Sequence, residues 1–343
     1  MIPLTPQAIQ NSRDDDPAWR AAMRSAIRDP RELLDLLDLP HELIAGAEAP
    51  LRAFPLLVPR GYAARMRRAD ASDPLLRQVL PLAKEAASVP GFVTDPVGDG
   101  PALAGPGLLH KYHGRALLIT TGACAVHCRY CFRRHYPYAE ASASRGHWNT
   151  VLETLRAQPE IDEIILSGGD PLMLDDEKLA ALVAALESLP QLRRLRLHTR
   201  LPVVLPERVD AGLLTWLRRS RLRIVCVIHA NHANELDDSV ATALDRLRGV
   251  GVTLLNQSVL LRGVNDDADA LEALSRRLFE CGVLPYYLHL LDAVAGAAHF
   301  DTPEARATAI VRALRARLPG YLVPRLVREE AGHDAKTEIP LRA

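Results

Sequence analysis

Lysine is scarce in this sequence. Lys84, Lys111, Lys178 and Lys336 are the lysines among the 42 basic residues, and all the others are arginine. Arginine stays protonated in proteins, whereas the amine of a lysine can lose its proton and act as a nucleophile. A lysine that is retained against this bias is therefore a candidate for chemistry that arginine cannot perform.

Several other features are absent as well. Acidic and basic residues balance at 42 each, so neither a nucleic-acid surface nor a basic membrane-binding face is expected. No apolar run approaches the roughly 18 residues of a membrane span, and the first residues lack the regions of a secretion signal. Three of the five cysteines are clustered, which does not indicate a disulfide framework. We expect a cytoplasmic protein that binds neither nucleic acid nor membrane.

The clustered cysteines are Cys124, Cys128 and Cys131, which follow an apolar run with the spacing C-x3-C-x2-C. Thiolates are soft ligands that suit iron–sulfur clusters or zinc. A structural zinc ion normally takes four ligands, so His127 or His135 would have to complete such a site. Three cysteines on one loop can instead hold three irons of a 4Fe–4S cluster and leave the fourth iron open for a small molecule. We favour the open cluster.

The chain divides into a helical part and a part in which strands and helices alternate. Helical patterns cover residues 17–45, 61–68 and 73–80, and residues 90–107 are rich in proline and glycine, which indicates a linker. We predict a helical N-terminal region with linker over residues 1–107, a barrel over 108–320 and a C-terminal segment over 321–343.

The alternation from residue 108 predicts an α/β fold with a parallel sheet or barrel. The predicted strands are 115–121, 161–167, 192–199, 222–229, 252–260 and 284–291. The predicted helices between and after them are 147–158, 175–189, 207–219, 235–250, 267–281 and 303–317. Six strand–helix units are fewer than the eight of a full barrel, and residues 321–328 are a candidate for one more strand.

Candidate active-site residues follow the predicted strands, where barrels of this kind place their active sites. Gly168 and Gly169 follow the second strand, and their missing side chains let the backbone approach a ligand closely. The other candidates at or after strand ends are Asp170, His198, Arg200, His229 and Asp292, and Gln257 lies on the fifth predicted strand. Lys336 lies in a glycine-containing loop after the last predicted strand, so it is the retained lysine best placed for chemistry.

Longer runs of sequence carry a resemblance to a known family. Segment 112–134, which contains the three cysteines, resembles the lysine 2,3-aminomutase family of radical S-adenosylmethionine (SAM) enzymes. The same resemblance extends to segments 165–172, 199–206, 229–232, 256–266 and 299–303. It implies a partial (β/α)6 TIM-like radical SAM barrel with a helical N-terminal domain. The run 131–138 and the short C-terminus are most similar to the bacterial subgroup that makes β-lysine for elongation factor P.

The resemblance also implies which residues bind the cofactors. Its cluster ligands are Cys124, Cys128 and Cys131, with SAM on the open iron. The motif that holds the methionine part of SAM matches Gly168, Gly169 and Asp170. Pyridoxal 5′-phosphate (PLP) would be held by Lys336, with Tyr112 and Arg115 around it and with His229 and Gln257 lining the shared site. The reaction implied by the resemblance converts L-lysine to β-lysine.

The substrate positions are implied in the same way. Arg133 matches the residue that pairs with the lysine carboxylate, and Asp292 matches one of two acids that hold the ε-ammonium. The second acid departs from the family pattern and falls on Glu329 or Glu330, of which we favour Glu329. The glycine run before the PLP lysine is reduced to Gly332, and the extra C-terminal cysteines of longer members are absent, so no zinc is expected.

Other functions stay open on the residues alone. They are an arginine aminomutase, a radical SAM enzyme without PLP that acts on RNA or a peptide, and a non-catalytic electron-transfer module. The expected partners are L-lysine and a one-electron donor such as flavodoxin or ferredoxin, with a functional link to elongation factor P and its lysine ligase. We also expect a homo-oligomer.

Overall fold

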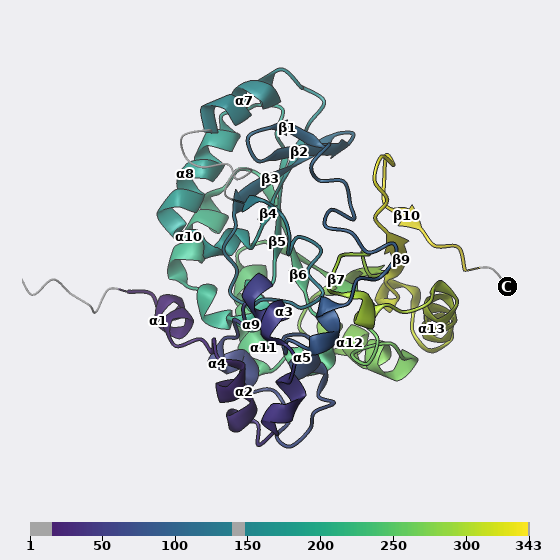
Figure 1. Cartoon of the computed structure of the whole chain (residues 1–343). Coiled ribbons are helices and arrows are strands. Elements are labelled where there is room, and N and C mark those ends of the chain that lie inside the picture. Colours follow the sequence, from purple (N-terminus) through teal and green to yellow (C-terminus); the bar gives the residue numbers. More distant parts are fainter. Residues whose placement is uncertain (1–15, 139–147, 342–343) are drawn as a thin grey trace, which may run out of the picture.

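The computed structural model describes residues 16–138 and 148–341. At its centre is a ten-stranded sheet whose strands are neighbours in chain order (Figure 1). The strands are β1 (Leu103–Gly105), β2 (Leu108–Tyr112), β3 (Arg115–Thr121), β4 (Glu163–Gly168), β5 (Arg194–Thr199), β6 (Arg223–His229), β7 (Thr253–Val259), β8 (Leu284–His289), β9 (Arg325–Arg328) and β10 (Thr337–Glu338). Strands β3 to β9 run parallel, and the outer pairs are antiparallel.

A helix follows each of the parallel strands β3 to β8 and lies outside the sheet (Figure 1). These helices are α7 (Trp148–Arg156), α8 (Asp176–Glu187), α10 (Ala211–Arg219), α11 (Asp238–Gly249), α12 (Ala268–Glu280) and α13 (Glu304–Arg317). A short helix, α9 (Leu201–Val204), comes between β5 and α10. The six strand–helix units confirm the predicted partial barrel, and β9 confirms the additional strand. Within the described residues β1 and β10 do not pair, so the sheet stays open.

Local sequence explains where these elements begin and which side they bury. Asp210, Asp237 and Asp267 cap α10, α11 and α12, because each carboxylate accepts a hydrogen bond from a backbone N–H of the first turn. Leu271, Leu274 and Leu278 of α12 recur at helical spacing and are buried, as an amphipathic helix requires. All six residues of β4 are buried, as expected for a parallel strand that is covered on both faces.

The N-terminal helices are short and pack beside the barrel (Figure 1). They are α1 (Ala18–Arg24), α2 (Pro30–Leu36), α3 (Glu48–Ala53), α4 (Arg60–Ala63) and α5 (Pro74–Arg77). Helices α4 and α5 end earlier than the predicted ranges 61–68 and 73–80. Trp19, Leu33 and Leu75 belong to the same hydrophobic cluster as barrel residues such as Leu195, so the two parts share one core. None of the helices in the described ranges is long and apolar enough to cross a membrane.

Segment 90–107, which was expected to be a linker, forms part of the barrel's wall. It contains β1, and Val93 forms a backbone bridge with Val294 in the loop after β8. The N–H of Val93 donates to the Ala293 carbonyl, and the N–H of Ala295 donates to the Val93 carbonyl, both at 2.8 Å. Residue 107, where we predicted the end of the N-terminal region, lies in the turn between β1 and β2. The three-part division of the chain remains a prediction.

The shared core leads to a prediction on stability. Leu195 on β5 is fully buried, so Leu195→Ala should lower the free energy of unfolding by about 2–5 kcal/mol through lost burial and the cavity that is left. Leu36→Ala makes the same chemical change at a side chain that is 38% exposed, and should stay within about 0.5 kcal/mol. Urea denaturation of the two variants checks this. Equal destabilisation by both would contradict the assigned core.

Candidate active site

A cavity of about 580 Å³ extends from the carboxyl ends of the parallel strands, where Cys124 and Gly169 lie, along the sheet as far as Arg115 at the start of β3. Every residue that the sequence predicts to hold a cofactor or the substrate lines it. These residues are Tyr112, Arg115, Cys124, Cys128, Cys131, Arg133, Gly168, Gly169, Asp170, His229, Gln257, Asp292, Glu329 and Lys336. Glu330, the alternative second acid, is not part of the lining, and its carboxylate accepts a hydrogen bond from the Thr337 hydroxyl.

The three cysteines after β3 are free thiols at the cavity wall. Burial, helped by the neighbouring Cys131, raises the pKa of Cys124 well above its usual range. Burial, helped by Cys128, raises the pKa of Cys131 to about 11. Crowded thiols in a dry site become thiolates when cations bind them, because the cations offset both the burial and the mutual repulsion. The loop is therefore suited to binding a metal group.

Neither histidine near the cysteines takes part in this wall. His127 Nδ1 lies 2.7 Å from the Pro55 carbonyl oxygen, and His135 Nε2 lies 3.1 Å from the Ala295 carbonyl oxygen. Among the residues that the structure describes, no three His, Cys, Asp or Glu side chains are arranged around a single metal ion. One ring nitrogen of each histidine thus contacts a backbone carbonyl, and neither ring lines the cavity with the cysteines.

The loop after β4 packs directly on the start of the cysteine loop. The N–H of Gly169 donates to the Thr121 carbonyl, and the N–H of Asp170 donates to the Ala123 carbonyl, both at 2.8 Å. A Cβ atom on Gly169 would lie 2.3 Å from the Ala123 oxygen, and Gly168 has a φ of 122° that side chains rarely adopt. Glycine is therefore required at both positions, and the pair positions the cysteine loop as well as exposing bare backbone to the cavity.

The Asp170 carboxylate joins two loops of the barrel. It accepts hydrogen bonds from the Thr199 hydroxyl and from the Arg200 N–H, both at 2.7 Å, and from the Leu172 N–H at 3.0 Å. Burial raises the pKa of Asp170 to about 6, although these hydrogen bonds oppose the shift. The carboxylate thus holds the ends of β4 and β5 together, and its contact with SAM stays a prediction.

A chain of alternating charges crosses the cavity wall. Arg133 Nε donates to one oxygen of Asp99 at 2.7 Å, and Lys111 Nζ binds the other at 2.7 Å. Lys111 Nζ also lies 3.8 Å from Glu329, which forms an ion pair with Lys336. Each charge has an opposite neighbour, which offsets the cost of burying it. The chain links the arginine of the cysteine loop to the lysine that is predicted to hold PLP.

Glu329 is the acid at the centre of the predicted PLP region. The Tyr112 hydroxyl donates to it at 2.6 Å. Burial alone would raise the pKa of Glu329, but the Lys336 ammonium and the hydrogen bonds from Lys336 and Tyr112 bring it below its ordinary value. Glu329 is therefore ionised at neutral pH, and it can bind a cation.

Two arginines in the cavity are available for an anion. Arg115 stacks over the Tyr112 ring, with 4.6 Å from the guanidinium carbon to the ring centre. Neither Arg115 nor Arg325 forms an ion pair with an acid in the described ranges, although both line the cavity. Guanidinium groups suit phosphate because their planar N–H donors match its oxygens.

Asp292, in the loop after β8, differs from the other acids of the cavity. It forms no ion pair with the residues described, whereas Asp99 and Glu329 each contact two cations. Burial raises the pKa of Asp292 to about 7, and the opposing effect of the Lys336 charge is smaller. A half-buried acid with a raised pKa and no cation beside it is a group that a cationic ligand would stabilise as the carboxylate.

Three histidines are held neutral by the cavity. His198 and His289 have Nε2 atoms that are buried without a hydrogen-bond partner in the part of the chain that the structure describes, and burial keeps the pKa of each well below its usual range. Burial likewise lowers the pKa of His229 to about 3, and its Nε2 lies 2.9 Å from the Tyr130 hydroxyl. Neutral rings in these positions can exchange hydrogen bonds with a bound cofactor.

The sequence did not identify Asp99 and Lys111 as parts of this site. Asp99 lies in the proline- and glycine-rich segment, and its partners Lys111 and Arg133 are distant in the sequence, so no local pattern marks it. Lys111 did carry a signal, because it is one of the four lysines kept against the arginine bias. The four are thus divided, with Lys111 and Lys336 in the cavity and Lys84 and Lys178 outside its lining.

Comparison with known proteins gives consistent matches. Residues 118–213 match the family model of the Radical SAM superfamily. An L-lysine 2,3-aminomutase from Escherichia coli is 50% identical over 333 residues, which cover 96% of each chain. The L-lysine 2,3-aminomutase of Haemophilus influenzae is 47% identical over 93% of this chain and 94% of the relative. That of Clostridium subterminale is 32% identical over 94% of this chain and 77% of the relative.

These matches agree with the open barrel and its three-cysteine loop, and together they define a radical SAM enzyme. Identity of 50% over nearly the whole length of both chains narrows the assignment further. The chain belongs to the lysine 2,3-aminomutase family, whose members are isomerases.

The residues of the cavity fit the cofactors of this class. A 4Fe–4S cluster with an open iron needs three thiolates, and the three thiols of the loop are free and half-buried. SAM must approach that iron closely, and the glycine pair presents backbone without side chains beside the loop. The donor set and the space therefore suit a cluster and a small molecule bound to it.

The contact between the two loops leads to a prediction. Gly169→Ala would push a methyl group into the Ala123 carbonyl, so the cysteine loop has to move. We expect a loss of stability of about 1–3 kcal/mol and fewer irons bound per chain after anaerobic reconstitution. Gly249→Ala is the matched control, because a Cβ at that position meets no atom within 4 Å. Iron loading of the two variants should differ, and equal loading would show that the loops can separate freely.

Proposed function

We propose that this enzyme converts L-lysine to β-lysine with a 4Fe–4S cluster, SAM and PLP. One observation carries the proposal: the three cysteine thiols and the Lys336 amine line the same cavity of about 580 Å³. A lysine kept against the arginine bias and next to a radical-generating site suits an enzyme that needs both cofactors. The relatives that are named L-lysine 2,3-aminomutase support the same reaction.

The cluster and SAM would be held on one side of the cavity. Cys124, Cys128 and Cys131 would each bind one iron, and the bare backbone of Gly168 and Gly169 would lie beside the SAM molecule. When bound, the reduced cluster and SAM supply a carbon radical that removes a hydrogen atom from the substrate. The protein's part is to hold the thiolates, exclude water and fix the distance to the substrate.

PLP would be held by the groups around Glu329. Lys336 supplies the amine that anchors PLP, and Arg115 suits its phosphate because no protein acid among the described residues occupies that guanidinium. The Tyr112 side chain is held in place by the stacking of its ring on Arg115 and by the hydrogen bond of its hydroxyl to Glu329. When bound, PLP supplies a conjugated ring that allows the substrate amine to migrate between adjacent carbons.

Charges in the cavity match the two ends of lysine. The Nε and Nη1 atoms of Arg133 are held by Asp99 and Ser167, while its Nη2 makes no hydrogen bond to the described residues and is available for the substrate carboxylate. Glu329 already binds the ammonium of Lys336, so it suits the chemically identical end of a substrate lysine. Asp292 would supply the second negative charge.

We also propose the wider setting of the enzyme. A one-electron donor such as flavodoxin or ferredoxin would reduce the cluster, and the reducing cytoplasm would protect it. The run 131–138 supports a functional link to elongation factor P and its lysine ligase. A homo-oligomer is part of the same proposal.

The decisive experiment is a turnover assay with the anaerobically reconstituted enzyme. Reduced enzyme with SAM and PLP should convert L-lysine to β-lysine, as followed by chromatography of derivatised amino acids. Conversion of arginine in place of lysine would replace the proposed substrate. Cleavage of SAM that needs neither PLP nor an amino acid would favour an enzyme acting on RNA or a peptide.

Lys336→Ala tests the assignment of the PLP lysine. We expect the visible absorbance of bound PLP and the β-lysine product to be lost, while the iron content stays at the level of the parent enzyme. Borohydride reduction of the parent followed by peptide mass spectrometry should find PLP on the peptide that contains Lys336. Lys178→Ala, at an exposed position on α8, is the control and should retain both PLP and activity. PLP on any other peptide would contradict the assignment.

Asp292 predicts a pH dependence. Because burial raises its pKa to about 7, the free enzyme carries a neutral acid below that pH and a carboxylate above it. A cationic substrate end binds the carboxylate, so kcat/KM for lysine should fall about tenfold per unit as the pH drops below 7. Asp292→Asn should lower kcat/KM and remove most of its dependence on pH below 7. Norleucine lacks the terminal ammonium, so its binding to the parent enzyme should not weaken as the pH drops below 7. The same weakening with norleucine would show that another group causes the pH dependence.

A further inference from the structure

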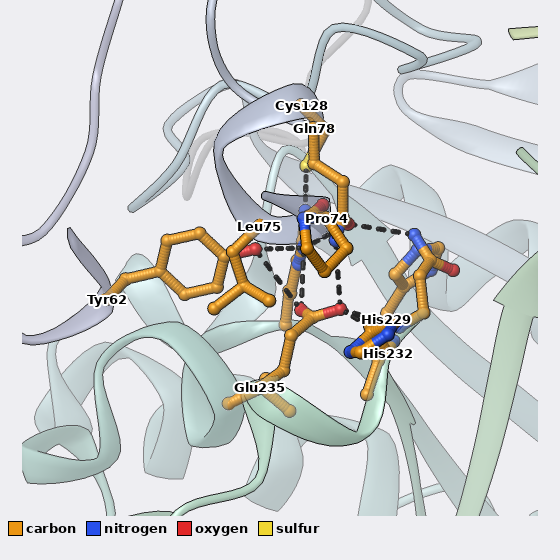
Figure 2. A network of polar contacts seen from close by, with 12 residues as sticks. Tyr62, Pro74, Leu75, Gln78, Cys128, His229, His232 and Glu235 are labelled. Carbon is orange, nitrogen blue, oxygen red and sulfur yellow. Dashed lines mark hydrogen bonds and ion pairs between the residues drawn. The ribbon is translucent and has the colours of Figure 1, made fainter. Parts of the chain in front are cut away.

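A buried arginine contacts the cysteine loop from the loop after β5. Arg200 is 7% exposed, and its Nη1 lies at hydrogen-bond distance, 2.7 Å, from the sulfur of Cys128. Figure 2 shows this sulfur at the edge of a dense polar network that includes Tyr62, Gln78 and Glu235. The sequence singled out Arg200 as a strand-end residue but gave it no role.

Three oxygen atoms fix the other end of the guanidinium. Its Nη2 donates to Glu235 and to Gln78, both at 2.8 Å, and to the Tyr62 hydroxyl at 3.2 Å (Figure 2). Tyr62 belongs to α4 and Gln78 directly follows α5, so the network also joins the N-terminal helices to the barrel. The guanidinium can therefore not turn away from Cys128 without breaking several buried hydrogen bonds.

Glu235 is itself held in one orientation. It is fully buried, and its second oxygen accepts hydrogen bonds from the N–H groups of Asn231 at 2.8 Å and of His232 at 3.0 Å. Both oxygens are therefore engaged, and the carboxylate presents a fixed negative charge to Arg200. The result is an oriented pair whose positive end touches the sulfur and whose negative end lies behind it.

The network also extends to the cavity. The Asn231 amide donates to Gln78 at 3.0 Å and to the Tyr130 hydroxyl at 2.8 Å. That hydroxyl lies 2.9 Å from Nε2 of His229, which lines the cavity. A continuous set of hydrogen bonds thus connects the sulfur of Cys128 with the ring of His229, and both residues line the cavity.

Such a pair acts on the redox chemistry of an iron–sulfur cluster. One-electron reduction adds a negative charge to the cluster, and the potential responds to hydrogen bonds on its sulfurs and to nearby charges. A cation in contact with a thiolate in a dry site favours the more negative, reduced state. A carboxylate on the far side of that cation disfavours the reduced state, but less strongly, because it lies farther from the cluster.

We propose that Arg200 is a positioning residue that donates a hydrogen bond to the cluster thiolate of Cys128 and that, with Glu235, sets the reduction potential of the cluster. The pair makes the first electron transfer easier while holding the sulfur in place. The inference depends on the cluster of this enzyme class but not on PLP or on lysine as the substrate. The role of Arg200 can therefore be disproved while the proposed reaction is upheld. Equally, the proposed reaction can be disproved while the role of Arg200 is upheld.

Redox titration of the reconstituted enzyme, monitored by electron paramagnetic resonance, tests the inference. Arg200→Gln removes the positive charge, so the reduction potential should become more negative. A smaller fraction of the cluster should then be reduced at a given solution potential. Glu235→Gln removes the negative charge, so the potential should become more positive. Arg208→Gln is the matched control, because Arg208 is also fully buried and paired with an acid, Asp176, at 2.7 Å. Its potential should equal that of the parent.

The opposite signs distinguish this role from a merely structural one. Looser packing would admit water in both variants and shift both potentials in the same direction. Iron content and circular dichroism report whether each variant folds and holds its cluster. If Arg200→Gln does not bind iron, Arg200→Lys replaces it, because lysine keeps the charge but not the planar fork. Its potential should be slightly more negative than that of the parent. Glu235→Gln still shows whether removing the negative charge makes the potential more positive. Equal potentials in all variants, or shifts of the same sign, would overturn the proposal.

Discussion

The cysteine loop is held by a closed ring of contacts between three neighbouring strand ends. The Asp170 N–H binds the Ala123 carbonyl, the Asp170 carboxylate binds the Arg200 N–H, and the Arg200 side chain returns to Cys128. The ring closes only because Gly169 has no side chain where the first two loops meet. The position of the three cysteines is thus fixed by backbone packing and buried polar bonds around their loop.

The charges of the cavity are of two kinds. Asp99 and Glu329 each contact two cations, and this alternation lets five charged groups share a buried wall. Asp292 stands outside this balance. The paired charges hold the wall in one arrangement. Asp292 has no such partner, so a cationic ligand that binds beside it would gain a favourable interaction. In the proposed complex, selectivity for a cationic ligand end would therefore come from the acid that the protein itself leaves without a cation.

Much of this structure could be predicted because its signals are local. The spacing of Cys124, Cys128 and Cys131, and the alternation of strands and helices, place ligands at strand ends without any knowledge of the fold. The contacts of Asp99 and Glu235 could not be predicted in this way. Their partners are distant in the sequence, and a single acidic residue in a loop has no pattern that distinguishes an internal ion pair from a solvated charge. Helix α4 is shorter than the predicted range 61–68, because helical composition and spacing indicate that a helix is present better than they indicate the residue at which it ends.

Segment 90–107 gives the cavity a wall of unusual composition. Its attachment rests largely on polar contacts, namely the backbone bridge at Val93 and the ion pairs of Asp99, with Val97 as a buried apolar contact. In the proposed complex the substrate carboxylate binds Arg133, the same cation that fastens Asp99. Asp99 binds Nε of that guanidinium and the carboxylate would bind the free Nη2, so one cation would fasten the wall and orient the substrate at the same time. Binding of the substrate and ordering of this segment are then thermodynamically linked, because each holds the guanidinium in the orientation that the other needs.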